Sequence, residues 1–250
     1  MCISLKKMKN KKRKVLILGG SSDIGNELVK NFLKLKWEVT AHFFKNKKKL
    51  ELLKKNSRDL KIIKLNFSNL STSNIENLIK KKFNNKYDSV INLIGYVDNK
   101  GFENTNLNSI LQSLTANALL PILIEKMLVK KMLSQKWGRI LNCSSIGVKF
   151  GGGINSYNYS LSKHCLEFIP NIYKNWAKKN VFINNLRVGV TNTKLHKKMG
   201  RKKTKMKNRL KLIPINRMAE PKEISAYIIS LTTESNSYIT GQTLTISGGE

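Results

Sequence analysis

Cysteine, proline and acidic side chains are scarce in this chain, and long apolar runs are missing. Its 250 residues include 3 Cys and 4 Pro. Cys2, Cys143 and Cys165 form neither a CxxC pair nor an even set, so the pattern is that of a reduced, intracellular protein, and we expect a cytoplasmic location. So little proline excludes a proline-rich or collagen-like architecture. The longest uninterrupted apolar run, 118–124, is shorter than the roughly 20 residues of a membrane helix, so we expect no membrane partner.

Negative charge is also scarce, because 15 Asp and Glu face 47 Lys and Arg, a net charge of +32. Of these 47 residues, 40 are Lys and 7 are Arg. Recognition of phosphates or bases favours Arg, whose planar guanidinium binds bidentately, so we expect no specific nucleic-acid partner. The lysines reflect either an AT-rich coding sequence or attraction to an acidic partner, such as nucleic acid, anionic lipid, an acyl carrier protein or a phosphorylated substrate.

The remaining composition is that of a globular protein, with 40% hydrophobic and 25% charged residues. A chain of this length can bury one continuous core. The basic segment 1–13 has no apolar stretch of its own, so we expect no secretory signal and interpret it as a disordered tail, with the start at Met1 or Met8. We expect one domain over 14–250.

Apolar runs and helical periodicities alternate along this domain. Short apolar runs predict strands at 15–18, 37–43, 62–65, 89–94, 139–143, 181–188 and 243–247. Periodic apolar residues predict helices at 25–33, 47–55, 75–83, 107–133 with an interruption at Pro121, 158–178 with Pro170 inside, and 220–232. The alternation predicts an α/β fold: a single-domain, Rossmann-type, doubly wound, seven-stranded parallel sheet flanked by helices.

A glycine-rich turn joins the first predicted strand to the first helix, with the sequence GGSSDIG over residues 19–25. Glycines let the backbone approach a pyrophosphate, and the free amides at a helix N-terminus face the anion. The flanking strand and helix favour a nucleotide site over a plain tight turn.

A tyrosine and a lysine share one face of the helix predicted at 158–178. Tyr159 and Lys163 are four residues apart, and a nearby ammonium lowers the pKa of a phenol, which suits it to acid–base chemistry. Ser144 and Ser145 follow the strand at 139–143, at the end where a doubly wound sheet opens its ligand crevice.

Together these motifs resemble the short-chain dehydrogenases/reductases, in the branch with the 3-oxoacyl-carrier-protein reductases. The resemblance covers 14–250. It rests on motifs in the family's order: GGSSDIG, NLIG at 92–95, Asn117 within LTANALLP, GRILNCSS, YSLSK, and RMAEPKEI followed by YITGQTLTISGGE.

The resemblance implies a catalytic set of Asn117, Ser145, Tyr159 and Lys163. In it Tyr159 exchanges a proton with the substrate oxygen, Lys163 lowers its pKa and binds the nicotinamide ribose, and Ser145 hydrogen-bonds that oxygen. Asn117 holds a water of a proton relay. Ser145 lies 14 positions before Tyr159, where the family usually has 13, so Ser144 stays an alternative.

The resemblance also implies a nicotinamide dinucleotide. Its expected binding residues are Gly19, Ser21, Ser22, Asp23, Ile24, Gly25, Lys45, Asn66, Phe67, Asn92, Gly95, Tyr159, Lys163, Thr191 and Thr193. Asp23 stands where the family has its middle glycine, and we interpret it as a helix cap that points away from the phosphates. Asn66 replaces an Asp that touches adenine.

The region after the second predicted strand favours NADP over NAD. NAD-specific members place an acid there to bind the ribose hydroxyls, and here residues 41–45 contain none, while Lys45 suits a 2′-phosphate. Lys45 as an ordinary solvated lysine is the alternative. His42 has no partner at metal-ligand spacing, so we expect no catalytic metal.

The sequence therefore predicts an NAD(P)(H)-dependent oxidoreductase of the ketoreductase type, which interconverts a carbonyl and a secondary alcohol. The alternatives are a binding or regulatory protein on the same fold with an acidic or nucleic-acid partner, and an epimerase-like or dehydratase relative. The motifs do not specify the substrate, which is either a small molecule or bound to a carrier. The basic segment 194–211 would be its lid and would suit an anionic group. The resemblance implies a homo-tetramer or homo-dimer.

Overall fold

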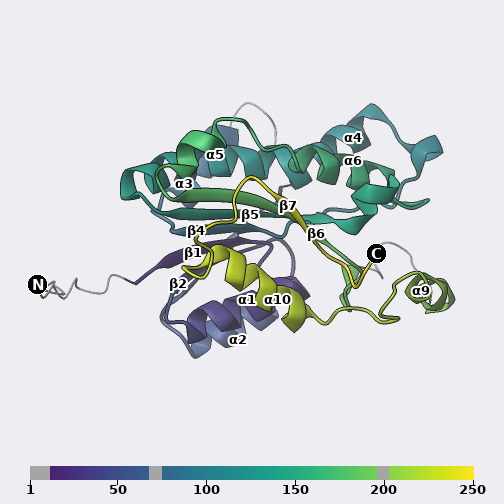
Figure 1. The fold of residues 1–250 in the computed structure, drawn as a ribbon, viewed down its shortest axis with the longest axis horizontal. Coiled ribbons are helices and arrows are strands. Elements are labelled where there is room, and N and C mark those ends of the chain that lie inside the picture. The colour runs from purple at the N-terminus through teal and green to yellow at the C-terminus, as the bar shows by residue number, and fades with distance from the viewer. Residues whose placement is uncertain (1–11, 68–74, 196–202) are drawn as a thin grey trace, which may run out of the picture.

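One seven-stranded parallel sheet forms the centre of the computed structural model, which describes residues 12–67, 75–195 and 203–250 (Figure 1). The strands run in the order β3-β2-β1-β4-β5-β6-β7. They are β1 (Lys14–Leu18), β2 (Glu38–Phe43), β3 (Leu60–Lys64), β4 (Ser89–Asn92), β5 (Gly138–Ser145), β6 (Val181–Val188) and β7 (Thr243–Ile246). The predicted fold class is confirmed, and the strand boundaries shift by no more than a few residues.

Helices cover both faces of this sheet (Figure 1). One face carries α1 (Asp23–Lys34), α2 (Lys48–Lys55) and α10 (Pro221–Thr232). The other carries α3 (Ile75–Phe83), α4 (Leu107–Leu114), α5 (Leu120–Gln135), α6 (Tyr157–Leu166) and α7 (Tyr173–Ala177). Short 3₁₀ turns lie at Phe102–Asn104 and Ile146–Phe150, and α9 (Lys203–Leu210) lies at one end of the molecule near the C-terminus.

Strand β1 shows why the apolar runs form central strands. Leu16 and Leu18 pack in the core under α3 and α5, while Val15 and Ile17 pack in the core under α1 and α10. All four side chains are 0% exposed. A strand covered on both faces needs apolar residues at every position, which is why it appears in the sequence as an unbroken run.

The strand order reverses at β1, which lies between β2 and β4. The chain builds one half of the sheet outward through β2 and β3, and then returns to add β4 on the other side of β1. Loops that leave the carboxyl ends of β1 and β4 therefore diverge and leave a crevice between them. The fold places the candidate site at this crevice.

Pro121 does not interrupt the long helix, contrary to our expectation. The chain stays helical from Leu107 to Gln135. Thr115–Leu119, labelled η3, is a π-helical turn in which the amide of Leu120 donates to the carbonyl of Thr115. Pro121 has no N–H to offer the Asn117 carbonyl four residues earlier, and the wider turn just before it keeps the helix continuous.

Within the described residues, this helix alone is long and apolar enough, by length and composition, to cross a membrane. In the structure 44% of its most apolar window is buried inside the protein. Leu120, Ile124, Leu128 and Met132 pack in the core against the sheet. Core helices of this kind pass the same test. No long uninterrupted apolar run marks this helix in the sequence, because Glu125 and Lys126 end the run at 118–124.

The single helix expected over 158–178 is wrong, because the structure has two. Helix α6 ends at Leu166 and α7 begins at Tyr173, with Pro170 in the turn between them. Proline disfavours the helical conformation of the residue before it and cannot donate to the turn before it. The apolar periodicity continues across the break because both helices face the same sheet.

Most of the expected tail, 1–13, lies outside the described residues. Its last two residues, Lys12 and Arg13, are described and form ion pairs. The ammonium of Lys12 lies 2.7 Å from the Asp59 carboxylate, and the guanidinium of Arg13 lies 2.8 Å from that of Asp88. These two residues are therefore bound to the domain.

Candidate active site

The glycine turn leads directly from β1 into α1. Gly19 has φ +83°, a conformation that favours glycine. A Cβ on Gly25 would lie 2.5 Å from the Gly19 carbonyl oxygen, so only glycine lets α1 begin this close to the turn. Ser22 is the N-cap, and its Oγ accepts a hydrogen bond of 3.0 Å from the amide of Gly25. The start of α1 thus presents its free amides toward the crevice.

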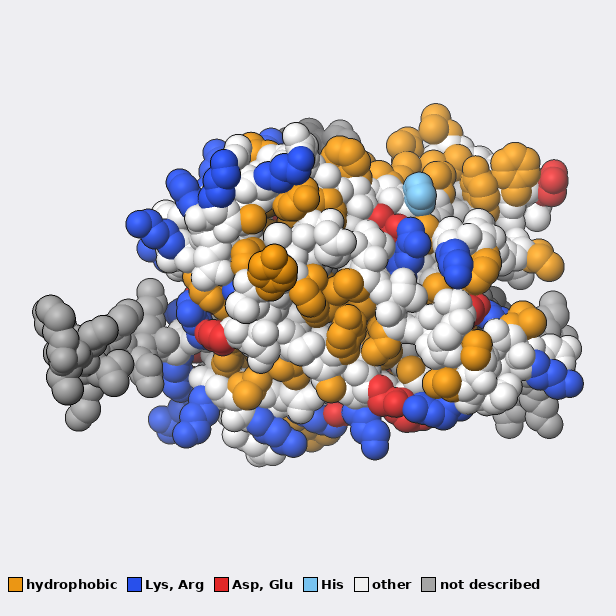
Figure 2. All heavy atoms as spheres, in the orientation of Figure 1, with side chains coloured by type: hydrophobic (Ala, Val, Ile, Leu, Met, Phe, Trp, Pro, Cys, Tyr) orange, Lys and Arg blue, Asp and Glu red, His pale blue; other side chains and the backbone are white. Residues whose placement is uncertain are grey.

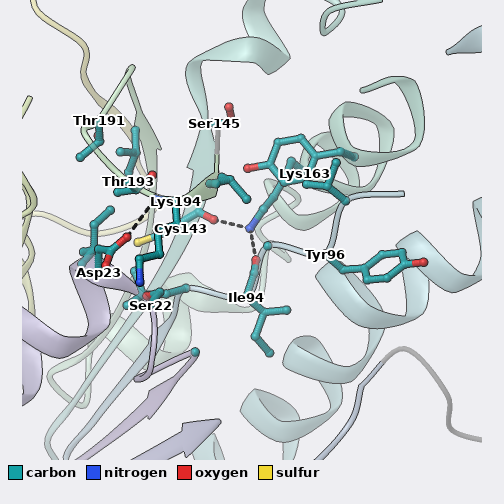
Figure 3. A pocket seen from close by; sticks show the side chains of 18 of the residues that line it. Ser22, Asp23, Ile94, Tyr96, Cys143, Ser145, Lys163, Thr191, Thr193 and Lys194 are labelled. Atoms are coloured by element: carbon teal, nitrogen blue, oxygen red, sulfur yellow. Dashed lines mark hydrogen bonds between the residues drawn. The ribbon is translucent and has the colours of Figure 1, made fainter. Parts of the chain in front are cut away.

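Contrary to our expectation, Asp23 does not cap α1 and does not point away from the cavity. It is the first helical residue, and its carboxylate lines the cavity. One oxygen accepts from the backbone amide of Lys194 at 2.9 Å (Figure 3). The other accepts from the ammonium of Lys49 at 3.1 Å. Burial raises the pKa of Asp23, but these two donors outweigh it and hold the pKa below its ordinary value. The cap falls to Ser22 because that residue is still extended.

His42 holds the glycine turn in place through a hydrogen bond, a role that the sequence did not predict. Its Nδ1 accepts from the amide of Gly19 at 3.1 Å, so Nε2 carries the proton and donates to the Leu65 carbonyl at 2.9 Å. The ring also stacks on Phe67, with 4.6 Å between centroids. Burial lowers the pKa of His42 to about 4, which keeps it neutral. The position of His42 at the end of the second predicted strand was the feature of the sequence that could have indicated this role.

Tyr159 and Lys163 lie one turn apart on α6 and are both buried, with exposures of 6% and 2%. The ammonium of Lys163 donates to the carbonyls of Ile94 and Cys143, each at 2.6 Å (Figure 3). It lies 6.0 Å from the centroid of the Tyr159 ring. Burial lowers the pKa of Lys163 to about 8. The ends of β4 and β5 thus fix a buried cation beside the phenol.

The two serines at the end of β5 have different surroundings. Ser144 is buried, and its Oγ donates to the Lys163 carbonyl at 3.5 Å. Ser145 is partly exposed, and its Oγ accepts from the amide of Gly147 at 3.2 Å. Both residues line the cavity. Because a hydroxyl that accepts from an amide keeps its own proton to donate, Ser145 is better placed to hydrogen-bond a ligand.

Asn117 lies in the π-helical turn and is fully buried. Its Oδ1 accepts from the Tyr96 amide at 2.7 Å, and its Nδ2 donates to the Tyr96 carbonyl and to Ser162 Oγ, both at 2.9 Å. The side chain therefore joins the loop after β4 to α6 rather than facing the cavity. Because Pro121 has no N–H, the main-chain carbonyl of Asn117 lacks its usual helical donor. This carbonyl is therefore the part of Asn117 that is suited to accept a hydrogen bond from water.

One cavity of about 990 Å³ collects most of the predicted site residues. Those that line it are Gly19, Ser21, Ser22, Asp23, Ile24, Lys45, Asn66, Phe67, Gly95, Ser145, Tyr159, Lys163, Thr191 and Thr193. Gly25, Asn92 and Asn117 lie behind its wall. The amide of Asn92 donates to Asn142 at 3.2 Å and its oxygen accepts from Ile94, which holds the ends of β4 and β5 in place.

Several further residues of the cavity were not foreseen. Lys49 comes from the first turn of α2 and lines the cavity, as does Lys45, which follows β2. Tyr96 lies in the loop after β4 (Figure 3). Its hydroxyl donates to Gln112 at 2.6 Å. Arg209 comes from α9. None of these belongs to a short motif, and only the tertiary fold brings them to the cavity.

No three His, Cys, Asp or Glu side chains among the described residues lie together in a way that suits a metal ion. Cys143 also lines the cavity, but burial raises the pKa of its thiol to about 12. A thiol in this state is a small apolar group rather than a nucleophile at neutral pH.

Only part of the basic segment 194–211 can be placed. Residues 196–202 of this segment lie outside the described residues. Lys194 and Leu195 line the cavity at one end of the segment, and Arg209 does so near the other. Arg209 also forms an ion pair with Glu250, which connects α9 to the C-terminus. A lid role for this segment remains a prediction.

Comparison with known proteins identifies the family. A family model described as enoyl-(acyl carrier protein) reductase matches residues 19–250, nearly the whole chain. The chain belongs to the short-chain dehydrogenase/reductase family. Among curated short-chain dehydrogenases/reductases, the 3-oxoacyl-[acyl-carrier-protein] reductase FabG of Aquifex aeolicus is 31% identical over 182 residues, which cover 70% of this chain and 72% of that protein. The acetoacetyl-CoA reductase of an Acinetobacter species is 27% identical and covers 94% of this chain and 96% of its own.

Solved structures of other short-chain dehydrogenases/reductases share the fold. A 3-oxoacyl-(acyl-carrier-protein) reductase from Agrobacterium tumefaciens C58, with NADP bound, superposes with a TM-score of 0.83 at 18% identity and covers 99% of this chain and 100% of its own. An NADPH-dependent reductase involved in bacilysin biosynthesis reaches 0.81 at 23% identity, over 96% and 98% of the two chains. With its family motifs, this short-chain dehydrogenase/reductase is an NAD(P)-dependent oxidoreductase of the ketoreductase type. The alternative of a pure binding protein is not favoured.

Proposed function

We propose that this protein is a cytoplasmic enzyme that uses NADPH to reduce the 3-oxo group of an acyl thioester, carried by coenzyme A or by an acyl carrier protein. The buried Tyr159–Lys163 pair supports this most directly, because it faces the same cavity as the glycine turn. The names of the similar curated proteins support the substrate class, since they act on 3-oxoacyl or acetoacetyl thioesters.

The cavity has the features that a dinucleotide needs. Gly19 and Gly25 form a turn that a Cβ would fill, and the amides at the start of α1 suit a pyrophosphate. Asn66 and Phe67 would contact the adenine, while Gly95, Thr191 and Thr193 would border the nicotinamide half and Ile24 would shape the wall. Asn92 does not line the cavity and would contribute by holding the end of β4 in place. When bound, the reduced dinucleotide supplies the hydride for the carbonyl carbon.

The chain itself supplies the proton and holds the carbonyl. Tyr159 would donate its phenolic proton to the substrate oxygen, and Ser145 would hydrogen-bond the same oxygen, so that the carbonyl becomes a secondary alcohol. The buried ammonium of Lys163 would stabilise the tyrosinate that remains and would bind the ribose of the nicotinamide. Ser144 is directed to the α6 backbone and is the weaker candidate for Ser145's role.

The proton lost by Tyr159 must be replaced from solvent. Asn117 would hold a water on this path by its main-chain carbonyl, since its side-chain amide is engaged by Tyr96 and Ser162. This carbonyl lies in the π-helical turn, four residues before Pro121. In this proposal the side chain of Asn117 positions the helix, and its backbone serves the relay.

The preference for NADPH rests on the cations beside the end of β2. Lys45 and Lys49 both line the cavity there, next to Asn46. A carboxylate at the end of β2 would bind ribose hydroxyls, and here the strand ends without one. Two ammonium groups favour the extra phosphate of NADP.

We also propose that the protein assembles into a homo-tetramer or homo-dimer. Hydrophobic side chains gather on the surface over α4 and α6, where Leu107, Leu111, Leu161 and Phe168 are exposed (Figure 2). Strand β7 forms one edge of the sheet and could pair with a second copy. A patch of this kind on a soluble enzyme is suited to association with its own copies.

Turnover with purified protein tests the proposed function. We expect the absorbance of NADPH to fall in the presence of acetoacetyl-CoA, and to fall more slowly when NADH replaces it at equal concentration. An acyl carrier protein loaded with the same acyl group tests the carrier. A protein that oxidises neither cofactor with any 3-oxoacyl thioester would contradict the substrate class.

A further inference from the structure

Asp23 puts a negative charge into the turn that would receive the phosphates of a dinucleotide under the proposed function. It is the first residue of α1, and its carboxylate lines the cavity beside Ser22 (Figure 3). Its side chain is only 20% exposed. A carboxylate at this position is stabilised by the helix N-terminus, which is also the feature that attracts a phosphate.

The donors of the Asp23 carboxylate come from elements far apart in the sequence. The ammonium of Lys49, on α2, lies 3.1 Å from one oxygen. The amide of Lys194, in the segment after β6, lies 2.9 Å from the other and is 171 residues away in the chain. The pKa of Asp23 is lower than usual because these two donors outweigh the effect of burial, so it is ionised at neutral pH. An ammonium, a backbone amide and a helix N-terminus are together the groups that bind phosphate.

We propose that Asp23 is an internal anion that competes with the phosphates of the cofactor for Lys49 and for the Lys194 amide, and thereby limits the affinity for NADP. This inference rests on the proposed function. In the free protein the carboxylate satisfies both donors. In the complex the donors turn to phosphate oxygens, and the free energy of breaking their contacts with Asp23 is subtracted from that of binding.

A purely structural clasp is the competing explanation, and it makes a different prediction. Both explanations expect the loss of the Asp23 charge to lower the stability of the free protein, because the helix N-terminus and Lys49 lose their anion. A structural clasp would leave cofactor affinity unchanged or weaken it. An internal competitor would make the affinity higher, so stability and affinity would change in opposite directions.

The first experiment compares the parent with Asp23→Asn, which removes the charge and keeps the size and an oxygen for the Lys194 amide. Isothermal titration with NADP at low salt should give a Kd lower by about five- to tenfold, and the gain should shrink at high salt. The melting temperature of the free variant should fall. Glu27→Gln is the matched control, since it removes one carboxylate from the same helix, where Glu27 pairs with Lys30.

The second experiment tests the transfer of Lys49 from Asp23 to phosphate. Lys49→Gln should weaken NADP binding, and it should do so by a larger factor in the Asp23→Asn background than in the parent. In the parent, Lys49→Gln removes the contact of Lys49 with phosphate, but it also removes the contact with Asp23 that would have to break on binding. The second effect offsets part of the first. Non-additivity of this sign in cofactor affinity is expected when the contact between Asp23 and Lys49 must break on binding.

The outcomes separate this inference from the proposed function. If the parent binds NADP and Asp23→Asn binds it equally or less tightly, Asp23 is no competitor. Should Asp23→Asn not fold, Asp23→Gly gives the same comparison, because the turn tolerates glycine there. If neither the parent nor an Asp23 variant binds NADP or NAD, the proposed function itself fails. Additive effects of the two substitutions would overturn the role of Lys49.

Discussion

Burial sets the ionisation of several single residues around the sheet. Lys163 and His42 have lowered pKa values, about 8 and about 4, and Glu125 on α5 has a raised pKa of about 8. In each case the largest cause is the loss of water around the charged form. Lys163 and His42 line the cavity. Glu125 accepts from Asn142 at 3.3 Å, and Asn142 in turn accepts from Asn92.

At this scale we predict that Tyr159→Phe abolishes most turnover and leaves NADP binding nearly intact. The phenylalanine keeps the packing of the ring and removes the only proton that Tyr159 offers. The loss of a positioned acid typically costs ~10²–10⁴ in rate. Stopped-flow turnover and cofactor titration on the same preparation measure the two effects, and activity within a few-fold of the parent would refute the role of Tyr159.

Glu125 gives a pH-dependent prediction. Its folded pKa of about 8 lies above the ordinary value of 4.5, so between these limits the folded state holds a proton that the unfolded state has released. Stability is therefore lost as pH rises through this window. Glu125→Gln removes that loss, and we expect it to stabilise the protein by about 1–3 kcal/mol more at pH 8 than at pH 5.

Urea unfolding at the two pH values measures this difference for Glu125→Gln. The contribution of His42 is the same in parent and variant and therefore cancels. Glu27→Gln, at a partly exposed carboxylate on α1, serves as the control and should show little difference between the two pH values. An equal effect of Glu125→Gln at pH 5 and pH 8 would mean that Glu125 is ionised in the folded protein.

At the scale of elements, the approach of α1 to β1 defines the nucleotide turn. A Cβ on Gly25 would lie 2.5 Å from the Gly19 oxygen and 2.8 Å from the Gly20 Cα, and both are backbone atoms. We predict that Gly25→Ala lowers stability by about 1–3 kcal/mol and weakens NADP binding, because α1 must move away from the turn. Urea unfolding and cofactor titration measure the two effects.

Gly95→Ala is the comparison for this substitution. The nearest neighbour of a Cβ on Gly95 would be a ring carbon of Tyr159 at 3.9 Å, which is an ordinary contact distance. We therefore expect little change in stability. Equal losses at Gly25 and Gly95 would show that the close approach of α1 is not the cause.

The elements also show how far sequence patterns go. Residues 181–188 form the predicted strand, and the other strands and most helices lie within a few positions of their predicted bounds. Helix α9 was not predicted, and the other errors fall at prolines. Pro121 follows a π-helical turn in a continuous helix, whereas Pro170 separates two helices. The sequence shows the same residue in both places, and only the packing of each segment decides whether the helix continues or ends.

For the whole molecule, the balance between apolar surface and charge decides assembly. The patch over α4 and α6 favours association, while a net charge of +32 per chain opposes it. Salt screens this repulsion over a Debye length of ~10 Å at 0.1 M. We predict a dimer or tetramer by light scattering, with a larger assembled fraction at higher salt.

Replacing Leu111 and Leu161 together by Asp should give a monomer of 28.5 kDa, because each change puts a charge into the apolar patch. Leu52→Asp is the control, since this leucine is also exposed but lies on α2, on the opposite face of the sheet. A monomeric parent at micromolar concentration, or assembly that survives the double substitution, would contradict this interface.

The sequence by itself determined the alternation of strands and helices, the glycine turn and the Tyr159–Lys163 spacing, because each depends on residues within a few positions of one another. The tertiary structure alone decided which side chains meet across the cavity. His42 reaches Gly19 from β2, and Asp23 meets Lys49 from α2 and Lys194 from beyond β6. These contacts depend on strand order and on the height of each strand end in the sheet. Local periodicity carries no information about either, since both arise only when distant segments pack together.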